Sequence, residues 1–186
     1  FNIRKGVNWQ DKAPMNGREL TADDVVFNFH RYLGLGDFTE AGPSTWGGAG
    51  HFISIPFESV TATDKRTVVM KLKEPNLAAL EIILNDSAVS ILPPEVIEQH
   101  GDMQDWRNVV GTGPFMVTDV VEESSITWTK NPDYWGYDEK YPQNRLPYVD
   151  EIRVLIIPEN ATILATMRTG KADFNMFTSI DEVKSI

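Results

Sequence analysis

A proline placed directly after two closely spaced glycines constrains the fold of this chain more than any other feature. The run is Val110-Gly111-Thr112-Gly113-Pro114-Phe115. Glycine-rich loops that cradle phosphate lead into a helix, whereas Pro114 lacks the N–H that a continuing helix would use. We expect the two glycines to turn the backbone with positive φ and the proline to direct it into a strand. A tight turn is therefore favoured over a nucleotide-binding loop.

Four other short runs accompany this turn. In chain order they are Leu20-Thr21-Ala22-Asp23-Asp24-Val25-Val26-Phe27, Leu72-Lys73-Glu74-Pro75-Asn76, Asn131-Pro132-Asp133-Tyr134-Trp135-Gly136 and Gly170-Lys171-Ala172-Asp173. Together with the glycine turn and the opening segment Phe1–Trp9, they resemble the family 5 extracellular solute-binding proteins. These are the dipeptide- and oligopeptide-binding components of bacterial ABC importers. The resemblance covers nearly the whole chain.

The resemblance implies a mixed α/β fold, with helices flanking mixed sheets, as in one lobe of a type II periplasmic-binding-protein-like structure. Residues 1–109 would form a small α/β subdomain of the first lobe. Residues 110–186 would belong to the first large lobe and end near the hinge. The family's second lobe is absent from this sequence, so we expect a leader before Phe1 and some two hundred or more further residues, as roughly follows from the family size.

The resemblance also implies a function. We expect a binding protein that captures periplasmic or extracellular peptides and delivers them to ABC permease subunits, as a monomer that is either free or lipid-anchored at the cell surface. Ligand contacts are implied for Trp46, in the loop after the first helix, and for Asn175, Met176 and Phe177, which lead toward the hinge. The residues alone also allow another interpretation, in which Phe38 and Trp46 hold their loop against the body and residues 175–177 are a buried strand end.

Other solutes and roles stay open as alternatives. Family members also take up nickel complexes and oligosaccharides, and a ligand-sensing module would use the same kind of lobe. A hydrolase is less favoured, because no Gly-x-Ser-x-Gly run and no cysteine is present. The histidines, His30, His51 and His100, lack the spacing of a zinc site. We therefore expect no catalytic residue, no metal and no cofactor.

The charge excludes one class of partner. The sequence has 27 acidic and 17 basic residues, which gives a net charge of -10. No cluster of Lys or Arg offsets this charge locally, so the chain repels the phosphate backbone of nucleic acids. The hydrophobic content of 41% is typical of a globular protein, and no apolar run reaches the ~18 residues that span a bilayer.

The pattern in the first quarter of the chain predicts a strand and then a helix. Phe1–Trp9 alternates in the manner of a strand, with a bend at Gly6. Thr21 is typical of a helix N-cap, because Asp24 follows three residues later as its acidic partner. Apolar residues then recur at helical spacing until Gly34, which ends a predicted helix of about thirteen residues.

Two hairpins and one buried strand are predicted further along. Residues 57–63 and 67–72 flank a short polar turn and form the first hairpin. Residues 115–119 and 126–130 form the second, directly after the glycine turn. The apolar segment 149–157 predicts a strand that is buried on both faces.

Short helices are predicted between and after these strands. Residues 76–84 form one, with an inward face made by Leu77, Leu80 and Leu84. Another begins at Pro94 and ends at Gly101. A third covers residues 160–169, and a short strand follows at 173–177.

Overall fold

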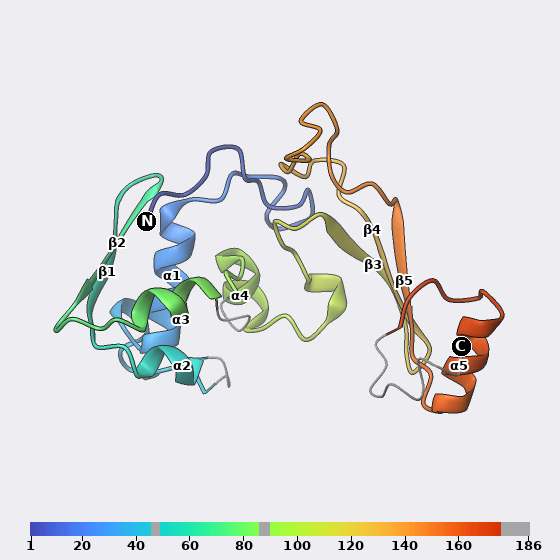
Figure 1. Cartoon of the computed structure of the whole chain (residues 1–186). Helices are drawn as coiled ribbons and strands as arrows, with labels where there is room; N and C mark the ends of the chain where they lie inside the picture. Colours follow the sequence, from blue (N-terminus) through green and yellow to red (C-terminus); the bar gives the residue numbers. More distant parts are fainter. Residues whose placement is uncertain (46–48, 86–89, 176–186) are drawn as a thin grey trace.

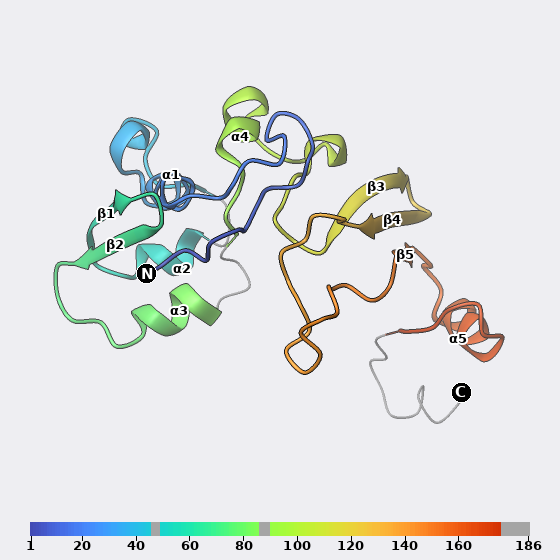
Figure 2. The ribbon, with the colours of Figure 1, turned by 90° about the horizontal axis from the view of Figure 1, so that it is seen from above.

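The computed structural model describes residues 1–45, 49–85 and 90–175, and these form a mixed α/β chain with two units (Figure 1). The N-terminal unit, residues 1–110, contains α1 to α4 and the hairpin β1-β2. The C-terminal unit, residues 111–175, contains a sheet of β3, β4 and β5 and the helix α5. In both views the segment before α1 runs across to the loop that precedes β3 and then returns (Figure 2). Within the described residues no helix is long and apolar enough to span a membrane.

The predicted first helix is confirmed as α1, Ala22–Leu33. Its N-cap is Thr21, whose backbone N–H donates to Asp24 Oδ2 at 2.8 Å. This contact satisfies one of the donors that a helix start leaves unpaired and fixes the first turn. Gly34 ends the helix in the left-handed conformation, with φ of 65°.

The first hairpin is also confirmed, as β1, Phe57–Asp64, and β2, Thr67–Leu72. The predicted N-terminal strand is wrong, because Phe1–Trp9 makes only isolated bridges. Gly6 has φ of 77°, and this bend sends the two halves of the segment to different partners. Asn2 bridges to Thr67 at the start of β2, and Asn8 bridges to Glu19.

The first apolar core lies between α1 and the hairpin. Phe29 of α1 packs edge-on against three rings, with centroids 6.2 Å from Tyr32, 5.4 Å from Phe52 and 6.0 Å from Phe57. Phe52 comes from the short helix α2, Ala49–Ile53, and stacks on Tyr32. Edge-on and offset pairs of this kind add to the stabilisation from burial.

The next helix, α3, is Ala79–Asn85, and its predicted inward face is wrong. Leu77, Leu80 and Leu84 are 101%, 60% and 69% exposed. In the turn that leads into α3, Asn76 accepts the backbone N–H of Ala78 through its side chain and that of Ala79 through its carbonyl. The core is instead contacted by the other face, formed by Ala79, Ile82 and Ile83.

The N-terminal unit ends with α4, Pro94–His100, which has proline in its first turn and stops at Gly101, as predicted. Two short 3₁₀ helices, η1 at Gly36–Phe38 and η2 at Trp106–Asn108, lie in the connecting loops. A second apolar cluster joins the N-terminal loop to α4 and the glycine turn. Its buried members are Val7, Trp9, Met15, Leu20, Val96 and Val110.

The first strand of the C-terminal unit, β3 at Phe115–Val121, begins directly after Pro114, as predicted. This strand pairs antiparallel with β4, Ser125–Lys130, so the second predicted hairpin is confirmed. β4 also pairs with β5, Glu151–Leu155, which gives the strand order β3-β4-β5. The helix α5, Asn160–Arg168, follows β5.

The predicted burial of residues 149–157 on both faces is wrong. Ile152, Val154, Leu155 and Ile156 are between 39% and 45% exposed. β5 pairs with β4 on one side only, and within the described residues no layer covers either of its faces. Residues 173–175 form no strand, and the rest of the strand predicted there lies outside the described residues.

Candidate functional site

Of the four predicted ligand residues, the structure describes Asn175. Trp46, Met176 and Phe177 lie outside the described residues. Asn175 is half-buried, after the exposed Phe174. In the loop that leads to Trp46, the ring of Phe38 packs edge-on against Phe27 with centroids 5.3 Å apart. Phe38 therefore holds its loop against α1, as one interpretation of the sequence expected.

The best-defined polar site lies where the two units meet, around residues 111–115. From the N-terminal unit, the backbone N–H of Gln10 donates to the carbonyl of Gly111 at 2.9 Å. Its side-chain Nε2 donates to the carbonyl of Phe115 at 2.8 Å, and its Oε1 accepts from the N–H of Gly111 at 3.1 Å. Gln10 is only 4% exposed, so these bonds form away from solvent.

From the C-terminal unit, the Asn131-to-Gly136 turn holds the same loop. Asn131 donates from Nδ2 to the carbonyl of Gly113 at 3.0 Å and from its backbone N–H to the carbonyl of Pro114 at 2.8 Å. Trp135 Nε1 donates to the carbonyl of Thr112 at 3.2 Å. Trp135 also packs against the second apolar cluster, so its ring contributes to packing as well as to hydrogen bonding. The two most specific sequence motifs thus form one structural unit.

The expected positive φ at the glycine turn is wrong, because neither Gly111 nor Gly113 is among the glycines with positive φ. A Cβ placed on Gly113 would meet no atom within 4 Å, and one on Gly111 would come no nearer than 3.9 Å. The loop is shaped by the hydrogen bonds to its carbonyls and by Pro114. Nothing in the described residues explains why glycine occupies these two positions.

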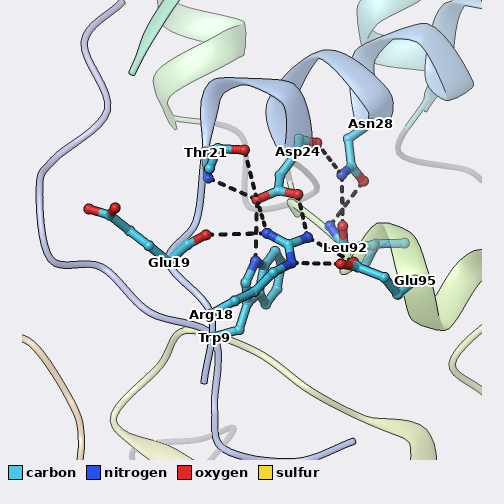
Figure 3. A network of polar contacts seen from close by, with 8 residues as sticks. All are labelled: Trp9, Arg18, Glu19, Thr21, Asp24, Asn28, Leu92 and Glu95. Atoms are coloured by element: carbon cyan, nitrogen blue, oxygen red, sulfur yellow. Dashed lines mark hydrogen bonds and ion pairs between the residues drawn. The ribbon is translucent and has the colours of Figure 1, made fainter. Parts of the chain in front are cut away.

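A second polar cluster ties α1 to α4 inside the N-terminal unit (Figure 3). Arg18 points its guanidinium between two carboxylates, with Nη2 2.7 Å from Asp24 Oδ1 and Nε 2.6 Å from Glu95 Oε1. Trp9 Nε1 also donates to Asp24 Oδ2, at 3.3 Å. Asp24 is 3% exposed, so its charge is compensated in a buried setting.

The electrostatics of this cluster follow from its hydrogen bonds. The bonds to Asp24 and Glu95 raise the pKa of the Arg18 guanidinium above its ordinary value. The bond from Arg18 lowers the pKa of the Glu95 carboxyl. Both carboxylates that face Arg18, those of Asp24 and Glu95, accept from its guanidinium (Figure 3). The arrangement is suited to holding two helices together.

Asn28 extends the same connection along α1. It is fully buried, and its Nδ2 donates to the carbonyls of Asp24 and Leu92, both at 2.8 Å. Its Oδ1 accepts from the N–H of Leu92 at 2.9 Å. The capping motif of α1 is visible in the sequence, but Glu95 and Leu92 come from a distant segment, and no spacing rule links them to Arg18 or Asn28.

One open pocket lies beside the junction and has a volume of about 330 Å³. It is lined by residues of both units, which are Gly6, Asn8, Trp9, Asp11, Asn16, Gly17, Asp133, Trp135 and Arg145. The lining carries charges of both signs, and it includes none of the four predicted ligand residues. In the part of the chain that the structure describes, no group of three or more His, Cys, Asp or Glu residues is placed to hold a metal ion.

Comparison with known proteins identifies the class. The family model described as bacterial extracellular solute-binding proteins, family 5, middle region, matches residues 1–186. The chain therefore belongs to this family, which consists of solute-binding proteins rather than enzymes. The resemblance noted in the short sequence runs is confirmed over the whole chain.

The relatives include peptide-binding proteins. The dipeptide-binding protein of Escherichia coli K12 is 29% identical over 92% of this chain and 32% of its own length. The heme-binding protein A of Haemophilus influenzae is 26% identical over 98% of this chain and 33% of its own length. Among solved structures, the periplasmic binding protein DppA of Helicobacter pylori, in complex with the peptide STSA, gives a TM-score of 0.77 at 28% identity. That match covers 99% of this chain and 36% of DppA. The chain thus spans about a third of the length of the relatives it matches.

Proposed function

We propose that this chain is part of the substrate-binding component of an ABC transporter that captures peptides for import. The observation that carries the proposal is the family match over residues 1–186. A dipeptide-binding protein among its relatives and a peptide-bound protein among its structural neighbours support peptide as the solute. Extended peptides can be bound through main-chain hydrogen bonds, which makes capture largely independent of peptide sequence.

In this proposal residues 1–109 are the small subdomain of the first lobe, and residues 110–186 are part of the first large lobe, up to the hinge. A second lobe, outside these residues, closes over the ligand. The chain spans about a third of its relatives' lengths, and this supports a further lobe in the whole protein. The fold is then a fragment of one lobe of a type II periplasmic-binding-protein-like architecture.

Ligand contacts are proposed for Trp46, Asn175, Met176 and Phe177. The aromatic rings would stack on peptide groups, and the Asn175 amide can both donate and accept.

The partners and location follow from the same proposal. The protein works as a monomer in the periplasm or at the cell surface, free or lipid-anchored, and docks on the permease subunits of its transporter. Heme-binding protein A among the relatives favours a second candidate, in which a solute other than peptide is bound. Nickel complexes and oligosaccharides belong to this candidate as well.

The experiment is a peptide uptake assay. A strain that lacks the gene should lose growth on di- to pentapeptides as its amino-acid source, and the intact gene should restore it. A Trp46→Ala gene should restore it poorly, whereas Tyr141→Ala, at a ring that is 48% exposed, should restore it fully. Normal peptide growth without the gene, together with lost use of heme or another solute, would favour the second candidate.

A further inference from the structure

The loop between the two units has the composition of a hinge but the hydrogen bonding of a fixed joint. Two glycines within three residues give a backbone the freedom that a hinge uses. Yet five consecutive carbonyls, from Gly111 to Phe115, each accept a hydrogen bond from outside the loop. A change of φ or ψ in this loop must break several of these bonds together.

The residues that donate hydrogen bonds in and beside this loop come from both units. Asn131 and Trp135 belong to the C-terminal unit, so their bonds hold the loop to its own sheet. Lys12 Nζ donates to the carbonyl of Val109 at 3.1 Å, which stays within the N-terminal unit. The side chain of Gln10 crosses the boundary, because it reaches Phe115 at the first position of β3.

Other contacts also cross the boundary, including the packing of Trp135 against the second apolar cluster. Arg4 lies over the ring of Trp135, with its guanidinium carbon 4.8 Å from the ring centroid, and Arg4 itself is exposed. Between regular elements, the main packing across the boundary is that of the short η2 against β3. Gln10 is buried and uses its donor, its acceptor and its backbone N–H on this one loop.

We propose that Gln10 is a positioning residue, which fixes the N-terminal unit relative to the β3-β4-β5 sheet so that the two move as one body. Its role in ligand capture rests on the proposed function: with this joint fixed, the two groups of proposed ligand residues keep their relative orientation while a second lobe closes. The bending of the protein then takes place outside residues 110–115.

The absence of cysteine in the sequence allows a direct distance measurement. Glu98→Cys on α4 and Asp119→Cys on β3 place one spin label on each unit, both at exposed positions. Electron–electron double resonance then gives the distribution of distances between the labels. No ligand is needed, so a result here is separate from the outcome of the peptide assays.

Three substitutions are compared in this labelled protein. Gln10→Met keeps the approximate side-chain volume and removes both side-chain hydrogen bonds, so we expect the distribution to widen by about twofold or more as the joint gains a bending mode. Gln10→Glu keeps the acceptor for Gly111 and loses the donor to Phe115, so it should give an intermediate width. Gln104→Met, at an exposed glutamine, should leave the distribution narrow.

The variant Arg18→Met is a control that distinguishes a loss of overall stability from a change in the relative position of the two units. Its ion pairs lie within the N-terminal unit, so this variant should lower the melting temperature while the distance distribution stays narrow. An unchanged distribution in both Gln10 variants would overturn the proposal. Loss of the folded state in both, seen by circular dichroism, would overturn it too, because Gln10 would then be a general stability residue.

Discussion

The two units of this chain bury their apolar residues very differently. The N-terminal unit has two apolar clusters, around Phe29 and around Trp9. Beyond Val110, no Val, Ile, Leu, Met, Phe, Tyr or Trp side chain of the described residues is fully buried. The C-terminal unit instead leaves Val154 and Leu155 exposed, although both lie on the antiparallel ladder with β4, and Ile156 beyond the strand is exposed as well.

The difference shows that hydrogen bonding and burial are separate requirements of a sheet. The sheet of β3, β4 and β5 has its ladder, but a sheet of this size is stabilised by the layer that packs on it. In the proposed lobe that layer comes from polypeptide outside the described residues. The N-terminal unit, with its own cores, supplies the stability of the described chain.

The variant expected to lose the most stability is Phe29→Ala. Phe29 is 2% exposed at the centre of the aromatic cluster, and such a truncation costs roughly 3–5 kcal/mol, a large part of the stability of a small protein. We expect the urea midpoint to fall sharply. Val154→Ala on β5, where the side chain is 43% exposed, should shift it by at most about 0.5 kcal/mol. Equal losses for the two variants would show that the comparison is wrong.

A smaller effect is expected for Arg18→Met. The variant leaves Asp24 buried without its main cation, but the Arg18 side chain is 33% exposed, so solvent reduces the cost to about 1–3 kcal/mol. Urea unfolding measures it. The control is Arg107→Met, whose ion pair with Asp105 lies at the surface and should contribute almost nothing. A loss at Arg107 as large as that at Arg18 would contradict this reasoning.

The two faces of α3 give a sharper comparison within the N-terminal unit. Ile82→Ala removes a side chain packed against the first core and should cost about 1–2 kcal/mol, whereas Leu84→Ala, at a 69% exposed position, should cost less than about 0.5 kcal/mol. Thermal unfolding of the two variants measures the difference. The reverse order would mean that the leucine face is covered in solution.

The smallest effect is a pH dependence from Glu95. The pKa of this carboxyl is lowered in the folded state by Arg18, so its contribution is present above the unfolded value of about 4.5 and is lost as the pH falls through the folded pKa. Glu95→Gln should therefore flatten the decline of the melting temperature below about pH 4.5. Glu98→Gln, on the exposed part of α4, is the matched control. An identical acid decline in the Glu95→Gln variant and the unsubstituted protein would contradict the assignment.

Local signals in the sequence predicted the elements that are set by local chemistry. The Thr21 cap, the Gly34 stop and the strand after Pro114 each depend on neighbours within a few residues, and all three are confirmed. The faces of α3 and β5 depend on what packs against them, and both predictions were wrong. Apolar character alone does not tell whether a covering layer comes from the same segment of chain.

The junction was only half predictable. The sequence motifs at Gly111 and Asn131 identified its C-terminal side. The predicted backbone conformation of the two glycines was wrong, since neither has positive φ. Gln10 and Arg18 sit in an irregular loop without periodicity, and their partners are distant in the sequence. Long-range hydrogen bonds of this kind leave no spacing signal in a single sequence.

The central claim, that these residues are part of a peptide-binding clamp, is tested most directly by isothermal titration calorimetry with di- to pentapeptides. Residues 1–186 and the intact protein would be titrated side by side. We expect saturable binding, micromolar or tighter, for the intact protein, and weak or no binding for residues 1–186 alone. Micromolar binding to residues 1–186 alone, or no peptide binding by the intact protein, would contradict the account.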